Sequence, residues 1–151
     1  MKQIRKIIFV DNGATCRAPM AAKIMERQLE GQDIVVCARG LVVLVPEPIN
    51  QKAEAVMISN GISVEGYRSA ELSGRDLEEG TIVFTMTGEQ KDKVSERFAY
   101  PHVFVLNKYV GDDLEVMDPY GGSIKSYGLL FETLTNTIGK LAEILSIKNR
   151  K

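Results

Sequence analysis

The chain has few residues of the kinds on which several classes of protein depend. Its 151 residues include one histidine, two cysteines and no tryptophan. With His102 as the single histidine, there is almost no material for a histidine-based metal site or for a catalytic pair that needs histidine. The two cysteines, Cys16 and Cys37, form no Cys-x-x-Cys motif. A disulfide framework is therefore not expected, and a reducing, cytoplasmic location is.

Long apolar runs and an excess of one charge are also missing. The longest apolar run near the N-terminus covers residues 7–10, which is far too short for a signal-peptide core or a membrane span. The formal net charge is -1, whereas a general nucleic-acid binder carries a basic excess. We therefore expect no nucleic-acid or membrane partner, and a chain that is monomeric or weakly dimeric.

Short apolar runs alternate with helical patterns along the whole chain. Such alternation is typical of an α/β fold with a parallel sheet and helices on both faces. We expect one domain, residues 1–151, with ligands at the carboxyl ends of the strands. The predicted strands are 6–10, 33–38, 81–85 and 103–106. The predicted helices run from 19 to about 30, from a cap at Asn50 to 59, from 87 or 88 to 98, and from a cap at Ser123 almost to the C-terminus, with one short helical turn within 69–79.

The segment after the first strand has the features of an anion-binding loop. A strand runs into a tight turn with a glycine and an arginine, and a helix begins directly afterwards. Successive backbone N–H groups in such a turn form an anion nest, and the helix N-terminus adds its dipole. Arg17 adds a guanidinium that can bind phosphate in a bidentate manner. The residues predicted to bind phosphate are Asn12, Gly13, Ala14, Thr15, Cys16, Arg17 and Ala18.

Two separated motifs resemble those of the low-molecular-weight protein-tyrosine phosphatases. Residues 11–19 resemble the family's Cys-x-Gly-Asn-x-Cys-Arg-Ser-Pro loop, with Gly13, Cys16, Arg17 and Pro19 in register. The run that begins Asp118-Pro119-Tyr120 resembles the family's Asp-Pro-aromatic element before its last long helix. The resemblance covers essentially the whole chain. It implies a four-stranded parallel sheet in the order 2-1-3-4 and a phosphorylated protein or small molecule as ligand, with no cofactor.

The resemblance also implies a role for individual residues. Arg17 would hold the phosphoryl oxygens, and Asp118 would act as the general acid and base. Residues 40–48 resemble the loop at the rim of the family's substrate site, so Val45 and Tyr120 would contact the substrate. The nucleophile's position is occupied by Asp11, the third candidate catalytic residue.

Other positions differ from the family's pattern together with Asp11. Ala14 stands for an asparagine that supports the loop, and Ala18 for a serine that hydrogen-bonds the thiolate. Tyr67 lies near the place of a histidine that bonds that asparagine in many members. We therefore expect cysteine-dependent phosphatase activity to be absent or weak, and the sequence leaves open whether the protein is an enzyme at all.

Three interpretations remain. In the first, a family member that is weak or inactive as a phosphatase still binds phosphate or a phosphorylated partner. In the second, Asp11 is an aspartyl nucleophile, with Mg²⁺ held by Asp11, Asp118 and either Asp112 or Asp113. In the third, the Asp11 carboxylate closes the loop itself and the protein is a non-catalytic interaction module. A thioredoxin-coupled arsenate reductase is rejected, because it needs further cysteines after position 37.

Overall fold

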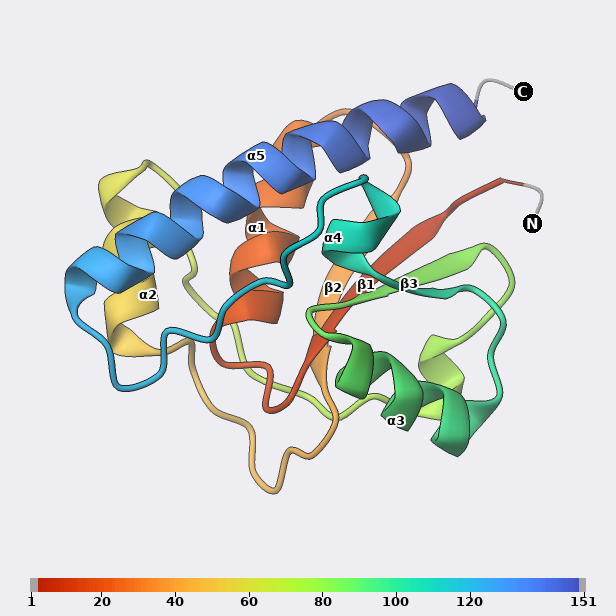
Figure 1. Cartoon of the computed structure of the whole chain (residues 1–151), viewed down its shortest axis with the longest axis horizontal. Coiled ribbons are helices and arrows are strands. Elements are labelled where there is room, and N and C mark those ends of the chain that lie inside the picture. The colour runs from red at the N-terminus through yellow and green to blue at the C-terminus, as the bar shows by residue number, and fades with distance from the viewer. Residues whose placement is uncertain (1–2, 150–151) are drawn as a thin grey trace.

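The computed structural model describes residues 3–149, and its centre is a parallel sheet. The strand order is β2-β1-β3-β4, and all three pairings are parallel, which confirms the predicted α/β fold and its strand order (Figure 1). The strands are β1 Lys6–Asp11, β2 Val35–Gly40, β3 Thr81–Thr85 and β4 Val103–Val105. β1 therefore lies between two neighbours, and its carboxyl end opens onto the edge where ligands bind in such sheets.

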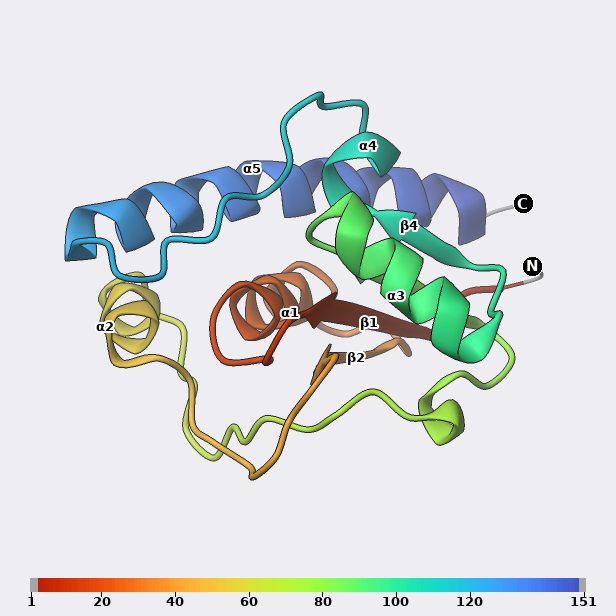
Figure 2. The same ribbon diagram turned by 60° about the horizontal axis from the view of Figure 1, so that its bottom comes forward.

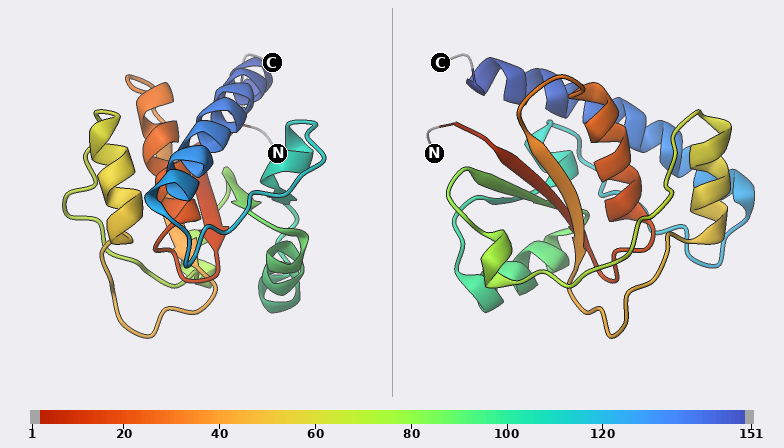
Figure 3. Two further views of the ribbon diagram at one scale, coloured as in Figure 1. Left: turned by 60° about the vertical axis from the view of Figure 1, so that its left-hand side comes forward. Right: turned by 180° about the vertical axis from the view of Figure 1, so that it is seen from behind.

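Helices cover both faces of this sheet (Figures 1 and 3). On one face lie α1 Arg17–Gln28, α2 Gln51–Ser59 and α5 Ile124–Asn149. On the other lies α3 Gly88–Phe98, while the single-turn α4 Leu106–Tyr109 follows β4. No helix among residues 3–149 is both long enough and apolar enough to cross a membrane.

The two faces of β1 supply two separate cores. Successive side chains of a strand point to opposite faces, so Ile7 and Phe9 pack beneath α1, α2 and α5, whereas Ile8 and Val10 pack on the side of α3. All four side chains are fully buried. The continuous apolar run in the sequence reflects this two-sided burial.

The element boundaries differ from the predicted ones at three places. α1 begins at Arg17 rather than at Pro19, because proline is tolerated anywhere in a first turn whose N–H groups have no helical partner. β2 is shifted two residues toward the C-terminus, since its pairing with β1 continues to the level of Asp11. Leu106 was expected to end the fourth strand but begins α4, because a four-residue helix is too short to show a helical period.

Two predicted caps and the predicted short helical turn are present. Asn50 caps α2 by accepting hydrogen bonds from the amides of Lys52 and Ala53, and Thr87 caps α3. The predicted helical turn within 69–79 is a 3-10 turn, Gly74–Asp76. Figure 2 shows the loop from β1 to α1 between α2 and α3, which places it where several connecting segments can supply side chains.

Candidate functional site

Asp11 is the last residue of β1, and its side chain is buried inside the loop that follows. Only 3% of Asp11 is exposed. Its Oδ1 accepts a hydrogen bond from the Ala14 amide at 2.5 Å, and its Oδ2 accepts one from the Ala18 amide at 2.7 Å. Each carboxylate oxygen is thus held by a main-chain N–H group of the loop. Ala14 and Ala18 were expected to contact phosphate, but their amides donate hydrogen bonds to Asp11 instead.

Burial raises the pKa of both Asp11 and the neighbouring Cys16. Loss of solvent raises the pKa of the Asp11 carboxyl, against the opposing effect of its two amide hydrogen bonds and of Arg17. Burial, followed by the neighbouring Asp11 and Asp118 carboxylates, raises the pKa of the Cys16 thiol to about 12. Because the thiolate is the reactive form of cysteine, the raised pKa makes Cys16 a poor nucleophile near neutral pH.

Other amides of the loop remain available to a ligand. Within residues 3–149, the N–H groups of Gly13, Thr15 and Cys16 donate to no protein acceptor. Gly13, Thr15 and Cys16 line a cavity of about 190 Å³ at the carboxyl end of β1. A Cβ atom at Gly13 would meet no heavy atom within 4 Å, so there is open space beside this residue. Free donors around a small hollow are the expected arrangement for binding a tetrahedral anion.

The guanidinium of Arg17 forms another wall of this cavity. Arg17 is 4% exposed, and its Nη1 donates to the Val116 carbonyl at 3.1 Å. Its Nη2 lies 3.6 Å from Oδ2 of Asp118, whose side chain is about half exposed. The Asp118 Oδ1 accepts the Tyr120 amide at 3.0 Å, which forms a local turn. Arg17 therefore joins the loop to the segment that carries the candidate general acid.

Three residues outside the loop hold it in shape. The Tyr67 hydroxyl donates to the Ala14 carbonyl at 2.6 Å, which supports Ala14 in a left-handed conformation (φ 59°) that alanine seldom adopts. A Cβ at Gly40 would lie 2.9 Å from the Gly13 carbonyl carbon, so only glycine lets β2 approach the loop so closely. The Gln90 Nε2 donates to Oδ1 of Asn12 at 3.2 Å.

Most of the candidate residues meet at one place. Asp11, Asn12, Arg17, Asp118 and Tyr120 line the same cavity as the free amides. Val45, predicted to contact the substrate, is not among the lining residues. It lies in the loop of residues 40–48 and is 61% exposed, while Val42 and Leu44 of the same loop are 57% and 92% exposed.

Two lining residues, Asn50 and Tyr127, were not predicted to belong to the site. The sequence identified Asn50 only as a helix cap and Tyr127 only as part of an amphipathic helix. The Asn50 amide donates to the Thr15 carbonyl at 2.8 Å, a contact between segments far apart in the sequence that no local pattern reports.

The metal site of the aspartyl hypothesis does not form as proposed. Among residues 3–149, no three acidic, histidine or cysteine side chains gather closely enough to hold one ion. Asp112 is engaged elsewhere, with its Oδ1 3.0 Å from the Lys140 ammonium. The predicted combination of Asp11 and Asp118 with Asp112 or Asp113 is therefore wrong for the described part of the chain, where these carboxylates form no common cluster.

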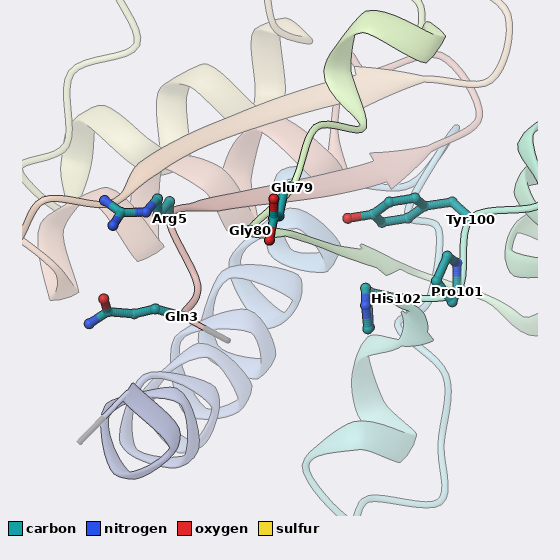
Figure 4. Close-up of a pocket in the computed structure, with 7 residues that line it drawn as sticks. All are labelled: Gln3, Arg5, Glu79, Gly80, Tyr100, Pro101 and His102. Atoms are coloured by element: carbon teal, nitrogen blue, oxygen red, sulfur yellow. The ribbon is translucent and has the colours of Figure 1, made fainter. Parts of the chain in front are cut away.

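A larger hollow, of about 620 Å³, lies at the opposite edge of the sheet (Figure 4). It contains His102, whose ring packs edge-on against Tyr100 at 5.7 Å between centroids. The Tyr100 hydroxyl donates a hydrogen bond to the Thr81 carbonyl at 2.6 Å. This hollow is at the amino ends of the strands, away from the loop amides and from Arg17, and we assign it no role.

Comparison with known proteins identifies the family. The family model for low molecular weight phosphotyrosine protein phosphatases matches residues 6–151. The chain belongs to this phosphatase family. It is 35% identical over 144 residues to a protein-arginine-phosphatase of Geobacillus stearothermophilus, covering 93% of this chain and 95% of that protein. It is 31% identical to the low molecular weight protein-tyrosine-phosphatase PtpB of Staphylococcus haemolyticus, covering 90% of this chain and 96% of that protein.

One similar solved structure contains a phosphorylated residue in its active site. The chain superposes with a TM-score of 0.89, at 30% identity, on a YwlE arginine phosphatase mutant in which serine replaces a cysteine and the active-site serine is phosphorylated. The superposition covers 96% of this chain and 98% of that one. These relatives are protein-arginine and protein-tyrosine phosphatases.

Proposed function

We propose that this family member binds the phosphate group of a phosphorylated protein in the loop of residues 11–18 without cleaving it by a cysteine mechanism. The observation that carries the proposal is the division of the loop amides. The Ala14 and Ala18 amides donate to the Asp11 carboxylate. The amides of Gly13, Thr15 and Cys16 donate to no acceptor within residues 3–149, and these three residues line the cavity.

The chemistry of Asp11 and Cys16 supports the absence of a cysteine mechanism. Asp11 stands six residues before Arg17, which is where the family's nucleophilic cysteine is expected. The neighbouring Cys16 thiol has a pKa of about 12 and so stays protonated. Neither side chain supplies a thiolate to attack phosphorus.

The main test is phosphate binding measured by isothermal titration calorimetry. The protein should bind inorganic phosphate, and Arg17→Ala should weaken binding by about tenfold or more, since it removes a charge-assisted contact. Arg27→Ala, which removes an exposed arginine at the far end of α1, is the matched control and should bind as the unchanged protein does. Undetectable binding, or equal loss in both variants, would refute the proposal.

The second test is recovery of catalysis. Asp11→Cys places a thiol among donors that can stabilise its thiolate. This variant should hydrolyse an aryl phosphate faster than the unchanged protein, and the gain should disappear when Arg17→Ala is added. No gain in a folded Asp11→Cys variant that binds phosphate would mean that the loop has lost more than its nucleophile.

A second candidate function is phosphoryl transfer onto Asp11. In its favour, the arginine phosphatase mutant carries a phosphorylated active-site serine, so a side-chain oxygen in the active site of a relative can receive the phosphoryl group. An Asp11 oxygen would attack phosphorus, the leaving group would take a proton from Asp118, and water would hydrolyse the acyl phosphate. Both Asp11 oxygens already accept amide hydrogen bonds, which weakens them as nucleophiles. Turnover that Asp11→Asn abolishes would establish this route in place of the first.

A further inference from the structure

Asp11 places a buried carboxylate beside the donor groups of the loop and of Arg17. An ionised carboxylate has about four lone-pair positions. The Ala14 and Ala18 amides use two of them. Asp11 also lines the cavity together with the free loop amides. Acceptor capacity is therefore left over for a ligand that enters the cavity.

A dianion in the cavity would repel the ionised Asp11 carboxylate unless a proton lay between the two groups. The cavity of about 190 Å³ is small, so a tetrahedral anion would lie against the carboxylate. Two anionic groups that share one buried site hold one proton between them, as paired carboxylates do. A phosphate ester has a second pKa of about 6, so its singly protonated form is accessible near neutral pH. Sulfate carries no proton there.

We propose that Asp11 makes the loop selective for tetrahedral oxyanions that carry a proton, so that it binds a phosphate monoanion and discriminates against sulfate. This inference rests on the proposed phosphate-binding function. The P–O–H group donates to an oxygen of Asp11, while the remaining phosphate oxygens accept from the free amides and from Arg17. Sulfate has no proton to donate, so it binds only when Asp11 itself is protonated.

The other groups around Asp11 do not produce this selectivity. Arg17 from α1 carries a fixed positive charge. The raised pKa values of the Cys16 thiol and the Tyr67 hydroxyl keep both neutral near pH 7. Asp118, from the segment before α5, is a second carboxylate near the site, but its side chain is about half exposed and is paired with Arg17.

Calorimetric titration with inorganic phosphate and with sulfate, between about pH 5.5 and about pH 8, tests the inference. Near neutral pH the protein should bind phosphate about tenfold or more tightly than sulfate, since sulfate lacks one charge-assisted hydrogen bond. Sulfate binding should strengthen as the pH falls. In Asp11→Asn, whose amide can donate to either anion, the two affinities should become similar and the pH dependence of sulfate binding should disappear. Asp113→Asn removes one exposed carboxylate elsewhere and should keep the preference.

The outcomes separate this inference from the function on which it rests. Equal affinity for phosphate and sulfate near neutral pH, or a pH dependence of sulfate binding that survives in Asp11→Asn, overturns the selectivity while phosphate binding stands. If neither anion binds at any pH, the proposed function itself has failed. The comparison of the two anions on the unchanged protein decides the question even if Asp11→Asn does not fold.

Discussion

At the scale of residues, the conformation of the loop depends on the hydrogen bonds that the Asp11 carboxylate accepts. Asp11 ends a buried strand, and burial there would be costly for a charge without partners. The Ala14 and Ala18 amides supply those partners, yet burial still raises the pKa of the carboxyl. The folded protein therefore holds this proton more readily than the unfolded chain does.

This difference predicts how the stability depends on pH. For an acid whose pKa is raised on folding, the stabilising contribution is complete below the unfolded value, here 3.8, and is lost as the pH rises through the folded value. The free energy of unfolding of the unchanged protein, relative to that of Asp11→Asn, should therefore fall as the pH rises. Urea denaturation at several pH values measures this difference. A constant difference, or one that increases with pH, would contradict the expected sign.

At the scale of elements, α3 supports the loop through its first turn. Gln90 is 2% exposed. Its Oε1 accepts the amides of Met86 and Thr87 at 2.9 and 3.1 Å, while its Nε2 donates to Asn12. One side chain thus completes the capping box of α3 and connects β3 with the loop after β1.

Gln90→Ala should lower the free energy of unfolding by about 2 kcal/mol, because it leaves the buried Met86 amide without its acceptor. It should also weaken phosphate binding, since Asn12 loses its contact with α3. Glu89→Ala changes an exposed residue of the same turn and should cost less than about 0.5 kcal/mol. Urea denaturation and phosphate titration of both variants provide the comparison. Equal stability of the two variants would argue against the bridging role of Gln90.

At the scale of the whole molecule, stability and anion binding depend on different regions. The larger core lies between the sheet and α1, α2 and α5, whereas the loop is held by contacts with Tyr67, Gly40 and Gln90. Leu134 is fully buried in the middle part of α5. It is seven residues, about two helical turns, beyond the lining residue Tyr127.

Leu134→Ala should therefore destabilise the protein by about 2–5 kcal/mol, the usual cost of a large-to-small change in a core. The affinity of the folded protein for phosphate should stay within about twofold of its original value. Thermal unfolding together with calorimetric titration at a low temperature measures both quantities. A large loss of affinity in a folded variant would show that the core and the loop are coupled.

Local sequence signals located much of the site before the fold was known. The apolar run of β1, the glycine and arginine after it, and Pro19 in the first turn of α1 together indicated an anion-binding loop. The caps at Asn50 and Thr87 were also recognisable, because capping depends on residues a few positions apart. The sequence did not reveal that Asn50 lines the cavity or that Gln90 contacts Asn12. Both contacts join residues that are far apart in the sequence.

The order of residues by itself determined the alternation of strands and helices, the family, and the Asp11 carboxylate at the end of the first strand. These depend on side-chain chemistry and short-range spacing. Only the tertiary structure decided what that carboxylate does. The loop turns the Ala14 and Ala18 amides onto Asp11, while Gly13, Thr15 and Cys16, whose amides donate to no acceptor within residues 3–149, line the cavity. That division depends on the backbone path imposed by β2, α2 and α3 around the loop, which no local pattern encodes.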